Sequence, residues 1–164
     1  MGVVANRLAE LGLTLPAVAA PVATYVPAVR SDRYVYTSGQ LPFVDGELPA
    51  RGKVGMGAGL VDPDDAAGYA RTAALNALAA VAALIGDLDQ VQRVVKVVGY
   101  VASDPSFTGQ PGVVNGASEL LGQIFGAAGV HARSAVGVAV LPLNAPVEVE
   151  LLLELRQTPA NLAV

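Results

Sequence analysis

The final apolar segment of the chain, residues 147–155, constrains the fold most strongly because its side chains alternate in character. Every second position is apolar, and these positions share one face: Val147, Val149, Leu151, Leu153 and Leu155. Glu148, Glu150 and Leu152 fall on the opposite face. This period of two predicts a β-strand that buries one face. Such a strand needs neighbouring strands and an apolar layer against it, so the chain is expected to fold around a sheet.

Four further strands are predicted before this segment. Residues 25–30 and 34–40 are expected to form a hairpin that turns at Ser31-Asp32. The Val-rich segments 93–102 and 133–141 have the apolar character of strands buried in a sheet. Together with the last segment they give a five-stranded sheet.

Two long helices are predicted between the strands. The first should begin at Asp62-Pro63, where a capping aspartate precedes a proline suited to the first helical position, and end at Gly86. The second should cover residues 113–125. The order β-β-α-β-α-β-β predicts an α+β fold, with two helices on one face of a mixed sheet. Residues 1–164 are expected to form one domain, with a short helix at 3–13 and a loose tail at 157–164.

Charge and composition argue against several classes of protein. The formal net charge is −4, from 10 basic and 14 acidic residues, and no run of Lys or Arg is present, so nucleic acid is not an expected partner. The chain has no cysteine and only one histidine, His131, so a metal site is not expected. A charged fraction of 15% favours burial of surface against further copies of the chain.

The sequence predicts a cytoplasmic protein without a membrane segment. A signal peptide has an uninterrupted apolar segment, whereas polar residues interrupt the apolar residues among the first ten positions. The most apolar stretch, residues 73–85, is too short to span a bilayer and contains Asn76.

Two charged residues are candidates for chemistry. Glu148 could act as a general base or orient a water, or it could be one of two solvated acids on a half-exposed face. Arg133 begins a strand that we expect to pair with the last strand. Its guanidinium could bind a carboxylate through two parallel N–H donors, or it could be a surface or ion-paired arginine.

Further candidates lie on the second strand and the second helix. Gly39 follows Ser38 and would allow a ligand to approach the backbone closely, although a bulge needed for packing explains it equally well. Asn115 and Ser118 lie one turn apart, where they could bind a ligand or cap the helix. The glycines of residues 52–59 lack the order of a phosphate-binding loop.

Four segments together resemble the Rid (YjgF) family. They are YTSGQLP at 36–42, NALAAV at 76–81, VVKVVGYVAS at 94–103 and HARSAVGVAVLPLNAPVEVELLLEL at 131–155. The resemblance covers nearly all of the chain after Pro21, and the last segment is its most specific part. The chain's length, its GKVG loop and its VNGASELLG helix are similar to a longer bacterial branch that carries an endoribonuclease or chorismate-mutase-like label.

The resemblance implies a homotrimer with ligand clefts between subunits, and hydrolysis of reactive enamines or imines to 2-keto acids and ammonia without a cofactor. By that resemblance Arg133 would bind the substrate carboxylate and Glu148 would handle the water. The matching binding positions are Tyr25, Ser38, Gly39, Asn115 and Ala135, where Ala135 replaces a cysteine found in many members.

Three hypotheses about function follow. The first is an enamine/imine deaminase that acts on a small carboxylate-bearing metabolite. The second is a non-catalytic trimer that binds small carboxylates or partner proteins, which needs Arg133 but not Glu148. The third, an endoribonuclease, is disfavoured by the acidic charge and by the lack of a histidine pair.

Overall fold

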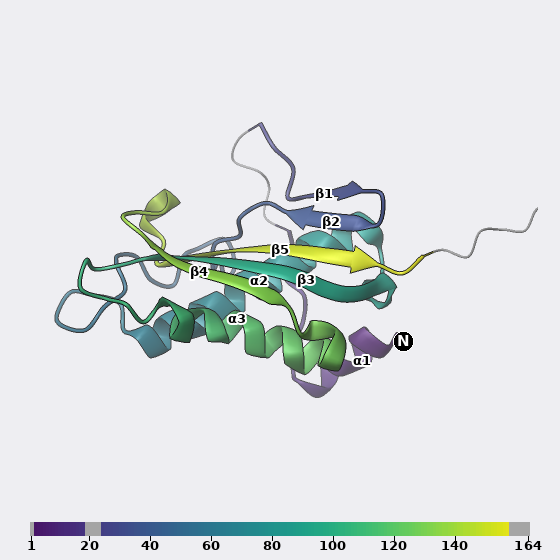
Figure 1. The fold of residues 1–164 in the computed structure, drawn as a ribbon, viewed down its shortest axis with the longest axis horizontal. Helices are drawn as coiled ribbons and strands as arrows, with labels where there is room; N and C mark the ends of the chain where they lie inside the picture. Colours follow the sequence, from purple (N-terminus) through teal and green to yellow (C-terminus); the bar gives the residue numbers. More distant parts are fainter. Residues whose placement is uncertain (1, 19–23, 158–164) are drawn as a thin grey trace, which may run out of the picture.

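The computed structural model describes residues 2–18 and 24–157 of the chain (Figure 1). The predicted loose tail lies outside these residues except for Gln157. The longer elements, in chain order, are α1 (Val3–Glu10), β1 (Ala28–Ser31), β2 (Tyr34–Thr37), α2 (Pro63–Ile85), β3 (Val91–Ala102), α3 (Gln110–Phe125), β4 (Ala132–Val138) and β5 (Val147–Leu155). Short 3₁₀ turns cover Leu88–Gln90, Gly126–Gly129 and Pro142–Asn144. The α+β class and the predicted order of the strands and two long helices are confirmed.

The five described strands form one mixed sheet in the order β1-β2-β5-β3-β4. Only β3 and β4 run parallel, and the other neighbours are antiparallel. β5 therefore lies between β2 and β3, so neither of its edges is free to pair with another strand. The prediction that the strand of Arg133 pairs with the last strand is wrong, because β4 pairs with β3 and lies at the edge of the sheet.

Both long helices cover the same face of the sheet (Figure 1). α2 begins as predicted at Asp62, whose carboxylate accepts a hydrogen bond from the Asp64 N–H at 2.8 Å. It ends at Gly86, which has a positive φ of 84° and donates to the Ala82 carbonyl. α3 begins at Gln110, three residues earlier than predicted, because its cap residue Gly109 offers no side-chain signal.

The helix layer packs closely because its contact residues are small. α2 buries mainly alanines: Ala66, Ala70, Ala73, Ala74, Ala77, Ala79 and Ala80. Where α2 and α3 cross, a Cβ added to Gly116 would lie 2.7 Å from the carbonyl carbon of Ala67. Where α3 meets the sheet, a Cβ on Gly99 would lie 2.7 Å from a methyl of Val114. Each distance is shorter than an ordinary van der Waals contact, so both glycines are needed for the spacing of the layers.

By length and composition alone, α2 would be able to cross a membrane. The apolar stretch at 73–85 is by itself too short to span a bilayer, but α2 begins ten residues earlier, at Pro63. Nine of its residues are buried inside the protein, against the sheet and α3. Its apolar composition is therefore accounted for by its place in the core.

The first hairpin is shorter than predicted and turns one residue later. Ser31 pairs with Tyr34, so the turn residues are Asp32 and Arg33. Asp32 adopts a positive φ of 52°, a conformation that aspartate tolerates better than most residues.

Candidate functional site

Glu148 lies on the open face of the sheet, away from the helices. The residues of β5 that alternate with it are buried beneath the helices, whereas Glu148 and Glu150 are only partly buried. In the register of the sheet, Glu148 lies opposite Tyr100 of β3. Burial, reinforced by the neighbouring Glu150 charge, raises the pKa of Glu148. A carboxylate with a raised pKa is a better proton acceptor near neutral pH than an ordinary one.

The Tyr100 and Glu150 side chains share this environment. Burial is also the main cause that raises the pKa of Glu150, with the nearby Tyr100 phenol partly offsetting it. The pKa of Tyr100 is raised by burial and then by the charges of Glu150 and Glu148. Tyr100 therefore remains a neutral phenol beside two carboxylates.

A bulge in the strand pairing brings Gly39 against Glu148. Tyr36 pairs with Leu152 and Gln40 pairs with Val149, so four steps along one strand face three steps along the other. One extra residue is therefore inserted between β2 and Gln40. A Cβ on Gly39 would lie 2.6 Å from the Cδ of Glu148. The bulge reading of Gly39 fits this geometry, and the space above Gly39 holds the Glu148 carboxylate; approach of a ligand to Gly39 stays a prediction.

Ser38 ties the preceding segment to this bulge. Its hydroxyl donates to the Val26 carbonyl at 2.6 Å, and its N–H donates to the Pro27 carbonyl at 2.9 Å. Tyr25, which comes directly before this segment, is 46% exposed and its ring is available to a ligand or to another chain. We call Ser38, Gly39 and Glu148 the acid half-site, with Tyr25 at its margin.

Asn76 of α2 supports the acid half-site from within the protein. Its amide nitrogen donates to the Leu41 carbonyl at 2.9 Å and to the Phe43 carbonyl at 3.0 Å. One side chain thereby uses both of its N–H donors to hold the backbone that follows Gln40. The amide thus fixes the segment after the bulge to the middle of the core helix.

Arg133 lies on the other face of the sheet. It pairs with Val97, which in turn pairs with the buried Leu151, so Arg133 points to the side of the helices. Its Nη1 donates to Asn115 Oδ1 at 2.8 Å and to Ser118 Oγ at 3.1 Å, and its Nη2 donates to the Pro111 carbonyl at 3.3 Å. All three acceptors belong to α3. We call Arg133, Asn115 and Ser118 the cation half-site.

Two donors of the guanidinium remain for a ligand. Of its five N–H groups, the Nε–H and one hydrogen of Nη2 have no acceptor among residues 2–18 and 24–157. No acidic side chain in that part of the chain forms an ion pair with Arg133. Two adjacent N–H donors match the two oxygens of a carboxylate.

Ala135 and His131 flank Arg133 in the chain. Ala135 shares the helix-facing side with Arg133 and packs partly against the core. His131 bonds through Nε2 to Ser118 Oγ at 3.0 Å and through Nδ1 to the Gly129 carbonyl at 2.6 Å. The histidine is therefore connected to the cation half-site, although it is not one of the predicted site residues.

Within one chain the two half-sites do not meet. Arg133 and Glu148 belong to different strands and point to opposite faces of the same sheet. A ligand that contacts both side chains must therefore lie between two copies of the protein, which is the arrangement implied by the family resemblance. The sequence alone did not reveal this division, because it depends on the position of β4 at the edge of the sheet.

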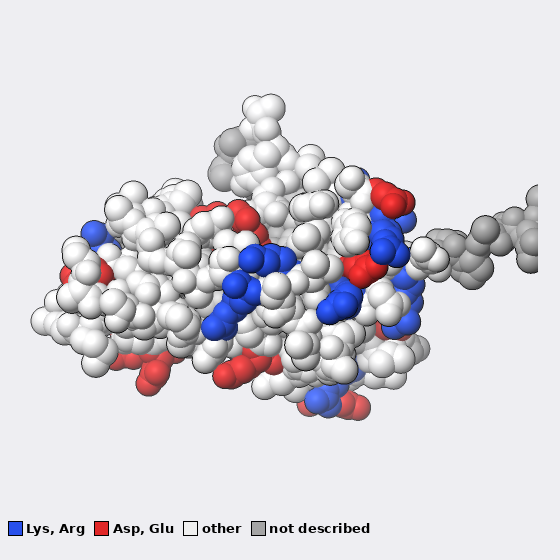
Figure 2. All heavy atoms as spheres, in the orientation of Figure 1, with Lys and Arg blue, Asp and Glu red and all other residues white. Residues whose placement is uncertain are grey.

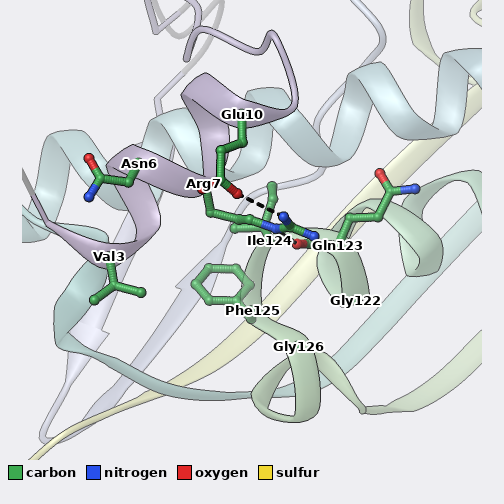
Figure 3. A pocket seen from close by; sticks show the side chains of 9 residues that line it. All are labelled: Val3, Asn6, Arg7, Glu10, Gly122, Gln123, Ile124, Phe125 and Gly126. Atoms are coloured by element: carbon green, nitrogen blue, oxygen red, sulfur yellow. Dashed lines mark hydrogen bonds and ion pairs between the residues drawn. The ribbon is translucent and has the colours of Figure 1, made fainter.

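A separate shallow pocket lies between α1 and the C-terminal end of α3 (Figure 3). Arg7 crosses it, pairing with Glu10 at 2.8 Å and donating to the Gln123 carbonyl at 2.7 Å. These contacts attach α1 to α3 and use the pocket's charged groups internally. The lining contains none of the predicted site residues, so we assign the pocket a structural role.

The charges on one face of the protein are distributed without a continuous basic patch. On the face shown in Figure 2, basic side chains form small separate groups with acidic groups between and below them. Among the described residues, no cluster of three or more histidine or acidic side chains is placed to hold a metal ion.

Tyr100 and the Pro111 carbonyl are components of the two half-sites that the sequence analysis missed. Tyr100 could have been found only from the strand register, because nothing in its local sequence marks it. Ser118 was a candidate because it lies one helical turn from Asn115. The sequence could not show that both side chains accept hydrogen bonds from Arg133, which lies on a separate strand.

The structure is a two-layer α+β fold with a half-buried carboxylate on one face of its sheet and a positioned arginine on the other. Comparison with known proteins shows the family to which this fold belongs. Residues 5–155 match the family described as "YjgF/chorismate mutase-like, putative endoribonuclease". The chain belongs to this YjgF (Rid) family.

Relatives match over almost the whole chain. Protein TCP17 of Trypanosoma cruzi is 46% identical, over 94% of this chain and 95% of its own length. The crystal structure of Atu1372 from Agrobacterium tumefaciens, a protein of unknown function, is 44% identical with a TM-score of 0.84, covering 94% of this chain and 93% of that one. A crystal structure from Shewanella oneidensis, described as a "putative endoribonuclease", is 34% identical with a TM-score of 0.87, covering 93% of this chain and 99% of that one. These relatives confirm the family and the fold and leave the reaction open.

Proposed function

We propose that this protein is a cofactor-independent deaminase that hydrolyses reactive enamine or imine forms of small amino acids to 2-keto acids and ammonia. The observation that carries the proposal is the half-buried Glu148, whose pKa is raised and whose carboxylate packs against Gly39 on the open face of the sheet. The site would lie between two copies, where the acid half-site of one faces the cation half-site of the other. A homotrimer with three such clefts is the assembly that we propose.

The residues divide the reaction between them. Arg133 would bind the substrate carboxylate through its free Nε–H and Nη2–H groups. Glu148 would accept a proton from a water as the water oxygen attacks the imine carbon, giving a carbinolamine. Return of that proton to nitrogen would make ammonia the leaving group; the C–N bond would then break as the hydroxyl oxygen forms the C=O bond of the 2-keto acid and passes its hydrogen back to Glu148 or to the departing ammonia. The carbon keeps its oxidation state throughout, so the reaction needs no redox cofactor.

One structural relative supports a ligand of this class. Escherichia coli TdcF, 23% identical with a TM-score of 0.60, was crystallised with bound serine. Serine carries the carboxylate and the amino nitrogen that the proposed substrate has, so a free amino acid or its 2-keto acid is a suitable probe.

The direct test measures ammonia release from freshly generated 2-aminoacrylate. Arg133→Ala and Glu148→Gln should each reduce the rate by about 100-fold or more, in the range of lost general-base catalysis. The matched controls are Arg93→Ala and Glu119→Gln, which make the same chemical changes at exposed positions outside both half-sites. Equal rates for wild type, both site variants and buffer would remove the proposal.

A mixing experiment tests the location of the site. If each cleft takes Arg133 from one copy and Glu148 from its neighbour, coexpression of Arg133→Ala and Glu148→Gln chains gives some clefts with both native residues. Activity should then return in the mixture, although neither variant is active alone. A mixture as inactive as its components would contradict a site shared between two copies.

A non-catalytic carboxylate-binding assembly is the second candidate. The cation half-site favours it, because Arg133 is already positioned by α3 without any help from Glu148. Under this alternative the protein binds pyruvate but releases no ammonia, and Glu148→Gln leaves the affinity unchanged. Turnover by wild type that disappears in Glu148→Gln would decide for the deaminase.

A further inference from the structure

His131 and Ser118 form a hydrogen-bonded chain with a defined direction. His131 Nδ1 lies 2.6 Å from the Gly129 carbonyl, which can only accept, so Nδ1 carries a hydrogen. In the neutral ring Nε2 is then an acceptor, and the Ser118 hydroxyl, at 3.0 Å, donates to it. The backbone of the turn after α3 thus determines the tautomer of His131, and His131 determines the direction of the Ser118 hydroxyl hydrogen.

This direction leaves the lone pairs of Ser118 Oγ for Arg133. Nη1 donates to Oγ at 3.1 Å, and its second hydrogen goes to Asn115 Oδ1 at 2.8 Å. Both hydrogens of Nη1 therefore have fixed acceptors. With one end of the planar guanidinium held in this way, the Nε–H and the remaining Nη2–H have a fixed direction before any ligand arrives.

We propose that Ser118 and His131 are positioning residues, which hold the Arg133 guanidinium in its ligand-binding orientation through the chain Gly129 carbonyl, His131, Ser118, Arg133. The inference deepens the proposed function and rests on it only in taking a carboxylate as the ligand of Arg133. Neither Ser118 nor His131 touches the substrate, so their effect is on binding and not on the chemical step.

The expected size of the effect follows from the loss of freedom of one long side chain. Immobilising a side chain with many rotamers weakens binding by roughly 2–10-fold when it is not already ordered. Ser118→Ala should therefore raise KM for 2-aminoacrylate, and the dissociation constant for pyruvate, by about that factor. kcat should stay within about twofold of wild type. The control is Thr72→Ala, which removes a helix hydroxyl that bonds to the Gly68 carbonyl of its own helix.

A double-mutant cycle shows whether Ser118 acts through Arg133. If it does, Ser118→Ala has no further effect on pyruvate binding in an Arg133→Ala background, whereas independent contributions would multiply. An effect of Ser118→Ala that persists undiminished in that background overturns the proposal.

A ligand-free measurement separates this proposal from the deaminase. In protein carrying ¹⁵N-arginine, rotation of the Arg133 guanidinium should be slow in wild type and faster in Ser118→Ala and His131→Phe, with the signal assigned by its absence in Arg133→Lys. If wild type releases no ammonia but this difference is present, the deaminase fails and the positioning chain stands. If rotation is the same in wild type and Ser118→Ala, the positioning chain fails whatever the enzyme assay gives.

Discussion

Gly116→Ala should destabilise the protein even though alanine is the better helix former. Gly116 lies inside α3, where replacement of glycine by alanine normally contributes about 1 kcal/mol to stability. Here the new methyl would lie 2.7 Å from the carbonyl carbon of Ala67 on α2 and still closer to its oxygen. Because these atoms belong to the backbone, no side-chain rotation relieves the contact, and the two helices must separate.

The magnitude follows from two opposing effects. Overpacking of this kind costs about 1–3 kcal/mol. A gap of 0.5–1 Å opened elsewhere along the helix crossing forfeits roughly a quarter to a half of each dispersion contact there. Against the helix-forming gain of about 1 kcal/mol, we expect a net loss of about 1 kcal/mol. Gly122→Ala in the same helix meets no described atom within 4 Å and should gain about 1 kcal/mol, so the two variants should differ by about 2 kcal/mol.

Urea unfolding followed by circular dichroism measures this difference. All three proteins must be compared at one protomer concentration, because association would make the unfolding midpoint depend on concentration. A Gly116→Ala variant at least as stable as wild type would refute the reasoning, because the two helices would then have room for a methyl group that the structure does not show. Equal losses in Gly116→Ala and Gly122→Ala would point to a general intolerance of α3 to substitution.

Three further predictions concern the acid half-site. Gly39→Ala should displace the flexible Glu148 side chain, which reduces ammonia release at least about tenfold while changing the free energy of unfolding by less than about 1 kcal/mol; a variant with native turnover would contradict this. Asn76→Ala leaves two carbonyls without their donor and should lose about 1–3 kcal/mol in urea unfolding, and an unchanged midpoint would show that these bonds contribute nothing. The raised pKa of Glu148 means that the folded protein holds this proton to higher pH than the unfolded chain does. The contribution of Glu148 to stability is therefore full below its unfolded pKa and lost as pH rises through the folded value. Glu148→Gln should gain stability relative to wild type as pH rises from about 4 to 7, and parallel stability curves would refute the shift.

The helix signals of the sequence were strong because they are local. Asp62, Pro63 and Gly86 fix the ends of α2 through contacts within a few residues of each other, and both ends were predicted correctly. The alternation of β5 was equally informative, since its period depends only on neighbouring positions. α3 was predicted too short because its cap, Gly109, makes no side-chain hydrogen bond and so leaves no pattern.

The arrangement of the site depended on information that the sequence does not carry locally. Nothing near Arg133 indicates that β4 joins the sheet beside β3, and this edge position is what separates Arg133 from Glu148. The link from Arg133 to Ser118 joins positions 15 residues apart on different elements. Family resemblance suggested which residues to consider, but their division into two half-sites required the register of the sheet.

The alanine-rich interior of α2 has a consequence for how proteins of this kind diversify. The buried side chains of α2 are mostly alanines. A larger side chain at one of these positions would push the helix away from the sheet, and replacement by glycine would leave a void. Substitutions on the buried side of this helix are therefore expected to cost stability whatever ligand the protein handles. The open face of the sheet has no helix packed on it within one chain. Homologues are expected to acquire new ligand preferences there while the helical layer stays almost unchanged.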